Sequence, residues 1–195
     1  DTLDSVLRQT FADFELILVD DCSKDGSGKI CDEVAASDGR VRVIHKEKNG
    51  GASSARNLGT KSASGKYLYY MDSDDKIDSD IFEKMYSASR DASPTVVMFG
   101  AVEEYYDKTG KLYMTNPVSY ESKALSGKEN VAKEVIKIEN TTLFGYLWNK
   151  IYLKDAVFSS GVTFCDMPLN EDFKFNIDFF RYVDSMVILN DTAYH

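Results

Sequence analysis

Three carboxylates crowd into the four residues Asp72-Ser73-Asp74-Asp75, directly after an apolar and aromatic run at 67–71. Carboxylates this close together repel one another unless a cation or a polyvalent ligand offsets their charge. The run before them is typical of a buried strand, and open α/β sheets bind ligands beyond the carboxyl ends of their strands. We therefore interpret the acidic cluster as the place where a divalent metal meets a phosphorylated substrate. A plain acidic approach to the next helix would not explain acids so close to the strand.

A second acidic group, Asp20 and Asp21, follows a predicted strand at 15–19. A carboxylate just past a buried strand can accept hydrogen bonds from a base or a ribose. From Asp21 to Asp32 the spacing of oxygen-bearing side chains also resembles an EF-hand loop. We rank that calcium loop below a plain polar turn, because a strand precedes it and Gly28 stands where an apolar residue is expected.

Glycines at the start of a predicted helix mark a third candidate, the segment 49–57 that ends in Arg56 and Asn57. Backbone N–H groups and the positive end of a helix dipole can receive an anion there. The guanidinium of Arg56 could bind a diphosphate as a bidentate donor. Taken alone, the segment more often marks a plain strand-to-helix turn with a surface arginine.

Alternating strand and helix patterns place these three groups at the ends of successive strands, which implies a parallel sheet in the first part of the chain. The predicted strands are 15–19, 41–45, 67–71, 95–102 and 186–189, with a hairpin at 103–115 that turns at 108–111. Helices are predicted at 1–10, 29–37, 52–63 and from about 79, 126 and 170. Their ends are assigned to Gly65 as a C′ residue, Asp78 or Ser79 as an N-cap, a capping box at 126–129, and Asn170 as an N-cap.

Composition describes an ordinary globular chain of 195 residues, with 43% hydrophobic and 28% charged residues. The net charge of -9 argues against a nucleic-acid-binding surface. Three cysteines without a CxxC pair, together with two histidines, argue against structural zinc, and the odd cysteine count favours a reducing compartment. No apolar run approaches the ~20 residues of a membrane span.

The ordered set of motifs resembles the family 2 glycosyltransferases. It comprises Val-Asp-Asp-x-Ser-x-Asp-Gly-Ser, then Asn-x-Gly-x-x-x-Ala-Arg-Asn, then Asp-Ser-Asp-Asp. Each motif is weak alone, whereas the set in this order and spacing is specific. The resemblance is strongest at 16–75 and covers nearly the whole chain, continuing with Trp-Asn-Lys-Ile-Tyr at 148–152 and with the pair Glu171-Asp172.

This resemblance implies a GT-A fold, α/β with a mixed, mainly parallel sheet flanked by helices, and a nucleotide-sugar donor, expected to be a UDP-sugar. Asp20 and Asp21 would face the base and ribose, and Arg56 would lie near the nucleotide. Asp72 and Asp74 would match the Asp-x-Asp motif that holds Mn²⁺ or Mg²⁺ together with the sugar nucleotide. A cation held by one or two carboxylates leaves positions for phosphate oxygens and offsets the charge of the leaving group.

The resemblance also assigns Asp172 as the catalytic base, which takes the acceptor's proton during attack that inverts the anomeric carbon. One domain, 1–195, would hold a nucleotide-sugar half at about 1–100 and an acceptor half at about 101–195. The acceptor would be a glycan or a lipid-linked saccharide. We expect the family's first strand to be absent ahead of the opening helix. We also expect a cytoplasmic location, with peripheral association at the inner membrane face as an alternative.

Two other function classes compete with this interpretation. A strand followed by Asp-x-Asp also resembles the haloacid-dehalogenase phosphatases, but Asp75-Lys76 stand where those enzymes usually have Thr or Val and then Leu or Ile. The upstream motifs have no role in a phosphatase. A non-catalytic calcium- or carbohydrate-binding module would leave the three loop clusters unexplained as a group.

Overall fold

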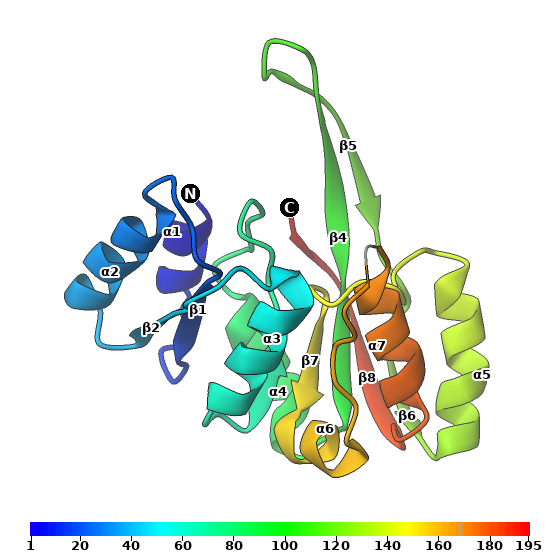
Figure 1. Cartoon of the computed structure of the whole chain (residues 1–195). Helices are drawn as coiled ribbons and strands as arrows, with labels where there is room; N and C mark the ends of the chain where they lie inside the picture. The colour runs from blue at the N-terminus through cyan, green and yellow to red at the C-terminus, as the bar shows by residue number, and fades with distance from the viewer. Residues whose placement is uncertain (168) are drawn as a thin grey trace.

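The computed structural model describes residues 1–167 and 169–195 and has a mixed α/β fold in which helices flank the strands (Figure 1). The helices are α1 (Thr2–Leu7), α2 (Ser27–Ser37), α3 (Gly51–Ser62), α4 (Ile81–Arg90), α5 (Lys128–Glu139), α6 (Lys154–Ser160) and α7 (Glu171–Phe180). The strands are β1 (Leu16–Asp20), β2 (Val41–His45), β3 (Tyr67–Tyr69), β4 (Val96–Tyr106), β5 (Leu112–Val118), β6 (Lys123–Ser126), β7 (Lys150–Leu153) and β8 (Ser185–Tyr194). None of the helices in the described residues is long and apolar enough to cross a lipid bilayer.

The first two strands form a parallel pair, as the alternating pattern predicts. Their register runs from Leu16 opposite Val41 to Asp20 opposite His45. The amide of Lys46 then donates to the carbonyl of Asp20 (2.9 Å), which continues the contact beyond the strands. The end of β1 and the turn before α3 therefore lie at the same edge, where the second and third candidate groups meet.

The larger sheet has the strand order β3-β7-β4-β8-β6, with β5 paired to the outer part of β4. Strands β4 and β8 are parallel, whereas the β3–β7, β4–β7, β4–β5 and β6–β8 pairs are antiparallel. Strand β3 thus pairs with β7, which corrects the expectation that the early strands form one parallel sheet. The sequence did not predict β6, β7 and α6, because such short elements carry too little periodicity.

Strand β4 passes through the centre of the core, and its residues Val96, Val97, Met98 and Phe99 are fully buried. Since successive side chains of a strand point to opposite faces, Val96 and Met98 join a cluster with α5 and α7. Val97 and Phe99 join a second cluster with α4. Both faces of the sheet are therefore covered, which gives the loops at the strand ends a rigid support.

Two predicted helix ends lie elsewhere because neighbouring segments compete for their backbone groups. The N-cap of α4 is Asp80 and not Asp78 or Ser79. The amide of Asp78 instead donates to Ala193 at the end of β8 (2.9 Å), which keeps this segment extended. Helix α3 ends with Ala63 in an extended conformation, so Gly65 is not its C′ residue.

The predicted capping box of α5 is also wrong, because the N-cap is Gly127, at φ +89°, without a side-chain cap. Asn170 is the N-cap of α7, as predicted, in a left-handed conformation and again without a side-chain hydrogen bond. Asparagine tolerates that conformation better than most residues. The chain therefore enters α7 through a left-handed residue, and Glu171 and Asp172 lie in the first turn of α7.

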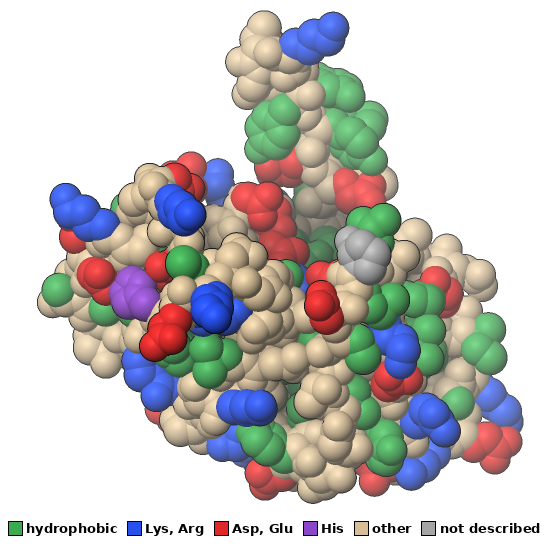
Figure 2. Space-filling view, in the orientation of Figure 1, with side chains coloured by type: hydrophobic (Ala, Val, Ile, Leu, Met, Phe, Trp, Pro, Cys, Tyr) green, Lys and Arg blue, Asp and Glu red, His purple; other side chains and the backbone are tan. Residues whose placement is uncertain are grey.

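The predicted hairpin is confirmed: β4 and β5 project from the body of the molecule (Figure 1). Its turn is closed by a hydrogen bond from the Gly110 amide to the Asp107 carbonyl (3.0 Å), with Gly110 at φ +78°. Exposed hydrophobic side chains lie along the stem of the hairpin, and acidic side chains gather at its foot (Figure 2).

Candidate active site

Arg56, in the second turn of α3, joins three carboxylates from distant parts of the chain. Its Nη1 donates to Glu171 (2.8 Å) and Asp172 (2.6 Å), and its Nη2 donates to Asp72 (2.9 Å). The guanidinium side chain is only 16% exposed. Three of the residues that the sequence singled out, Arg56, Asp72 and Asp172, thus meet in one network, and Glu171 completes it.

The pKa values of the two adjacent carboxylates, Glu171 and Asp172, are shifted in opposite directions. Burial raises the pKa of Asp172 to about 6; Arg56 opposes this rise, and Glu171 and Asp72 add to it. Burial also acts to raise the pKa of Glu171, but its own backbone amide and Arg56 outweigh burial and lower it. Asp172 therefore has the acidity that a general base near neutral pH needs.

The carboxylates of the acidic cluster have different surroundings. Asp72 is held by Arg56, and its amide donates to the hydroxyl of Tyr194 (3.4 Å). The same hydroxyl donates to Asp75 (2.6 Å). Burial, with Asp74 and Asp72 adding to it, raises the pKa of Asp75 although the Tyr194 bond opposes the rise. Asp74 is exposed at the tip of the loop, so its carboxylate is open to a ligand.

The carboxylates of the acidic cluster suit a hard divalent cation that also binds phosphate. No group of three or more His, Cys, Asp or Glu side chains in the described part of the chain could hold an ion alone. Mg²⁺ and similar ions, however, often take only one or two carboxylates and fill their other positions with phosphate oxygens and water. Beneath the loop, the Tyr69 hydroxyl is buried without a hydrogen-bond partner among the described residues. A buried hydroxyl without a partner costs about 1–3 kcal/mol.

Asp20 belongs to a separate cluster at the end of β1. Its carboxylate accepts from the amide of Ser23 (3.0 Å) and lies 2.9 Å from Nδ1 of His45. These bonds to Ser23 and His45 lower the pKa of Asp20 to about 2. The other ring nitrogen of His45 lies 2.9 Å from Asp32 on α2. Asp20 is thus a fixed anion at the sheet edge, linked through His45 to α2.

Asp21 occupies the anion site that the sequence assigned to a ligand. Its carboxylate accepts from the amides of Gly50 (3.0 Å) and Gly51 (2.7 Å) and from the ammonium group of Lys46. Burial alone would raise the pKa of Asp21, but Lys46 and the two glycine amides lower it. The positive end of the α3 dipole is therefore already occupied by a carboxylate of the same chain. This corrects the expectation that these amides receive a ligand, and it depends on how β1 packs against the turn before α3.

Asn57, the last residue of the third motif, holds the segment that leads to α7. Its side-chain amide donates to the carbonyl of Phe164 (2.8 Å), and the Phe164 amide donates back to its oxygen (2.9 Å). The Phe164 ring stacks on Phe175 of α7, with centroids 4.2 Å apart. Asn57 thus positions the α7 start next to Arg56, a role that the sequence alone did not reveal.

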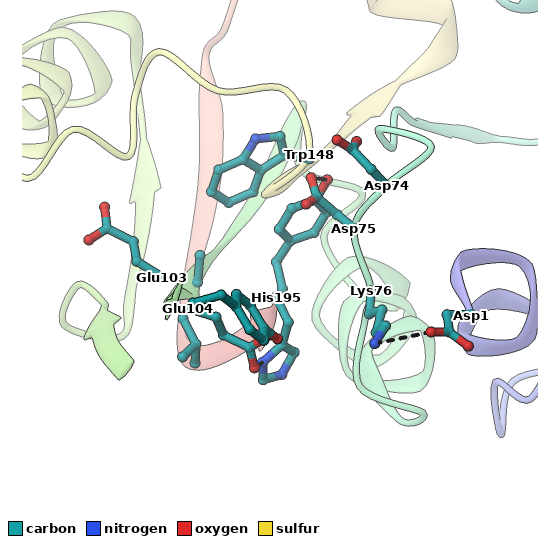
Figure 3. A pocket seen from close by; sticks show the side chains of 12 residues that line it. Asp1, Asp74, Asp75, Lys76, Glu103, Glu104, Trp148 and His195 are labelled. Atoms are coloured by element: carbon teal, nitrogen blue, oxygen red, sulfur yellow. Dashed lines mark hydrogen bonds and ion pairs between the residues drawn. The ribbon is translucent and has the colours of Figure 1, made fainter. Parts of the chain in front are cut away.

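A cavity of about 550 Å³ opens beside the acidic loop (Figure 3). Trp148 and Tyr194 line it together with the acidic residues of the loop and of β4. The sequence noted Trp148 only as part of a motif and assigned no role to Tyr194, because β8 meets the acidic loop only in the folded chain. In Figure 3, Asp74 and Asp75 lie on one side of Trp148, and Glu103 and Glu104 lie on the side of β4.

A sequence model of the family described as glycosyl transferase family 2 matches residues 1–157. The chain belongs to glycosyltransferase family 2. The expected family is confirmed. This membership argues against both alternatives, the haloacid-dehalogenase phosphatase and the non-catalytic calcium- or carbohydrate-binding module.

Two relatives of this family 2 chain come from bacteria. It is 32% identical over 193 residues to the uncharacterized glycosyltransferase EpsJ of Bacillus subtilis (strain 168), covering 98% of this chain and 55% of EpsJ. It is 29% identical over 198 residues to the poly(ribitol-phosphate) beta-N-acetylglucosaminyltransferase TarP of Staphylococcus aureus (strain N315), covering 100% of this chain and 57% of TarP. The family 2 chain thus spans about half the length of these relatives.

Solved structures confirm the GT-A fold of the family 2 chain. The crystal structure of S. aureus TarS 1-349 in complex with UDP has a TM-score of 0.77 at 21% sequence identity. The match covers 99% of this chain and 54% of that one. At this level of identity the likeness concerns the fold alone.

Proposed function

We propose that this family 2 chain is the catalytic part of a metal-dependent, inverting glycosyltransferase that moves a sugar from a UDP-sugar to a glycan or a lipid-linked acceptor. The observation that carries the proposal is Arg56, which joins Asp72 of the acidic motif to Asp172 at the start of α7. Support also comes from the fold neighbour TarS, which was crystallised with UDP and with UDP-GlcNAc.

Asp74 and Asp72 would hold Mn²⁺ or Mg²⁺ through their carboxylate oxygens. When bound, the cation would offset the negative charge that grows on the diphosphate leaving group. Asp74 is exposed and so free to turn toward the cation, whereas Arg56 fixes the orientation of Asp72. A guanidinium has five N–H donors, so Arg56 could keep its carboxylate partners and also contact the diphosphate.

Asp172 would act as the general base and Glu171 as its permanently charged neighbour. Adjacent carboxylates whose pKa values are pushed apart divide into a proton acceptor and a fixed charge. Here the pKa of Asp172 is raised to about 6, and that of Glu171 is lowered. Asp172 would take the proton of the acceptor hydroxyl as its oxygen attacks the anomeric carbon from the face opposite the leaving group.

The nucleotide half, about residues 1–100, would contribute Asp20 and Asp21 at the end of β1. Their carboxylates shape the edge of the sheet toward α2 and α3, and we assign that edge to the base and ribose. The acceptor half, about residues 101–195, would contribute β4 and α7. A lipid-linked acceptor would bring the protein to the inner face of the membrane as a peripheral protein.

Calorimetry with UDP tests the donor and metal assignments together. We expect UDP to bind wild-type protein in the presence of Mn²⁺, with at least about tenfold weaker binding in EDTA, because unscreened carboxylates repel the diphosphate. Asp74→Ala should lose the effect of Mn²⁺, whereas Asp91→Ala, which removes an exposed acid at the end of α4, should keep it. A Mn²⁺ effect of equal size in Asp74→Ala would remove Asp74 from the metal site.

A further inference from the structure

A buried ammonium group closes the turn that the segment 143–149 forms before β7. Nζ of Lys150 donates to the carbonyls of Leu143 (2.8 Å) and Tyr146 (2.6 Å) and to the side-chain oxygen of Asn149 (2.7 Å). Lys150 and Asn149, which come from the Trp-Asn-Lys-Ile-Tyr motif, are fully buried. A buried charge is costly unless it is hydrogen-bonded, and these three acceptors match the three donors of the charged form. The three bonds therefore hold the turn in one shape.

Asn176 of α7 binds the same turn. Its side-chain NH₂ group donates to three consecutive carbonyls, those of Phe144 (3.0 Å), Gly145 (2.9 Å) and Tyr146 (3.0 Å). Its oxygen accepts from the hydroxyl of Tyr152 on β7 (2.8 Å). Asn176 is fully buried, and the Tyr146 carbonyl also accepts from the buried ammonium group. The turn thus joins α7 to β7 through a polar network inside the core.

The turn also contacts the start of α7 directly. A Cβ atom at Gly145 would lie 3.1 Å from Cδ2 of Phe173, the residue after Asp172. The Phe173 ring packs edge-on against Phe144, with centroids 6.0 Å apart. Asp172 and Asn176 lie on the same face of the helix, because they are four residues apart. The turn therefore holds α7 at two positions close to Asp172.

The carboxylate of Asp172 is also held by α3. It accepts from Nη1 of Arg56 at 2.6 Å, and the Asp172 side chain is 22% exposed. A shift of α7 by a fraction of an ångström would change this contact. Catalytic rates are sensitive to such displacements, since a misplacement of about 1 Å can cost about 10²-fold.

We propose that Asn176 and Gly145 are positioning residues for the general base, because their contacts determine where α7 places Asp172. Asn176 ties the helix to the turn, and Gly145 leaves the space that Phe173 needs beside it. This inference rests on the proposed function, which assigns Asp172 as the base. It goes beyond that function by naming the residues that place the base.

Gly145→Ala tests the proposal without removing a hydrogen bond. The new methyl group would meet the Phe173 ring at 3.1 Å, so the start of α7 must give by a few tenths of an ångström. UDP release is measured with Mn²⁺, water as the acceptor, and UDP-glucose, UDP-galactose or UDP-N-acetylglucosamine as the donor. We expect turnover to fall about fivefold, with an unchanged Kd for UDP. Gly39→Ala, whose methyl group meets no atom within 4 Å, should change neither. Equal turnover in the two variants would overturn the proposal.

Phe173→Val in the Gly145→Ala background separates misplacement of the helix from general damage. Valine has no δ carbon atoms, so the atom that the methyl group meets is removed. The double variant should therefore turn over at the rate of Phe173→Val alone. Independent effects of the two changes, which multiply, would mean that Gly145→Ala does not act through α7 and would count against the proposal.

A carboxyl titration tests the same placement without turnover. ¹³C NMR of the aspartate carboxyl groups measures the pKa of Asp172, whose signal is assigned from its loss in Asp172→Asn. Asn176→Ser leaves the turn carbonyls without their donor, so the start of α7 should move away from Arg56. The pKa of Asp172 should then rise above its wild-type value of about 6, because the guanidinium that lowers it is more distant. Asn130→Ser, at an exposed asparagine of α5, is the matched control and should not change it.

A folded Asn176→Ser protein with the wild-type pKa of Asp172 would overturn the role of Asn176. Where this variant does not fold, Gly145→Ala takes its place in the titration and should also raise the pKa.

The two readouts separate this proposal from the proposed function. Absence of UDP release in wild type would remove the transferase assignment, while the titration would still test the placement of Asp172. Normal UDP release in wild type, with unchanged turnover and pKa in Gly145→Ala, would remove the positioning role alone.

Discussion

Asp172 combines a half-buried position with a nearby cation, and its pKa is a compromise between the two. Burial disfavours its ionised form, and Arg56 favours it, which leaves the pKa at about 6. The ordinary value for an aspartate is about 3.9. Ionisation of Asp172 therefore lowers the free energy of unfolding at neutral pH. Such a loss of stability is expected where activity needs a strained site.

Asp172→Asn should consequently raise stability at neutral pH. In the folded protein the pKa is raised, so the stabilising contribution of this group is complete below about pH 4 and is lost as pH rises through about 6. The variant lacks this loss, so its free energy of unfolding at pH 7 should exceed that of wild type by about 1–3 kcal/mol. Urea unfolding between pH 4 and 8 measures the difference, with Asp91→Asn as an exposed control. A variant less stable than wild type at pH 7 would contradict the burial argument.

Arg56→Met should have the opposite effect on stability. It leaves Asp72, Glu171 and Asp172 close together without a cation, and loss of the shared donor from this half-buried network should cost about 1–3 kcal/mol. The same change removes the influence that lowers the pKa of Asp172, so its titration should move to higher pH. Thermal melting and the acid limb of the pH–rate profile measure the two effects. Arg42→Met, at an exposed arginine paired with Glu15, is the control and should change neither.

At the scale of elements, β4 carries a constraint that only glycine satisfies. The strand is irregular around Gly100, where its pairing with β8 shifts register. A Cβ atom at Gly100 would lie 2.3 Å from the carbonyl oxygen of Val118 and 3.0 Å from that of Asp191. Both contacts are backbone atoms of β5 and β8, which cannot move aside cheaply.

Gly100→Ala should therefore destabilise the sheet by about 1–3 kcal/mol or more, the range for overpacked cores. Gly39→Ala is the matched control, because a Cβ there meets no atom within 4 Å. Comparison of urea midpoints gives the difference. A Gly100→Ala protein as stable as Gly39→Ala would mean that the backbone of β5 or β8 moves aside without a loss of stability.

Local pattern predicted β1, β2, α2, α3 and the β4–β5 hairpin, because each depends on residues close in sequence. It failed where contacts between segments far apart in the sequence determine the structure. Strand β7 enters the sheet between β3 and β4, and the segment after Lys76 pairs with the end of β8. The network of Arg56 with Asp172 spans 116 residues, so only the motifs, and not their contacts, were visible in the sequence.

On the scale of the whole molecule, the two halves of the chain meet at charged groups. Arg56 and Asp72 come from the first half, and Glu171 and Asp172 come from the second. A donor bound by the first half would therefore lie next to the base supplied by the second. The acids at this junction belong to a chain with a net charge of -9, so a cation is expected to be needed before a diphosphate can approach.

The most direct measurement is the release of UDP from a UDP-sugar with Mn²⁺ and saccharide acceptors, made beside UDP calorimetry, for wild type and Asp172→Asn. A general base acts on the chemical step, so turnover should fall by about 10²–10⁴-fold, while UDP affinity stays within about threefold of wild type. Asp178→Asn, an acid on the same helix paired with Lys174, should leave both unchanged. Turnover of Asp172→Asn within a few-fold of wild type would contradict the account and direct attention to Glu171 or Asp166.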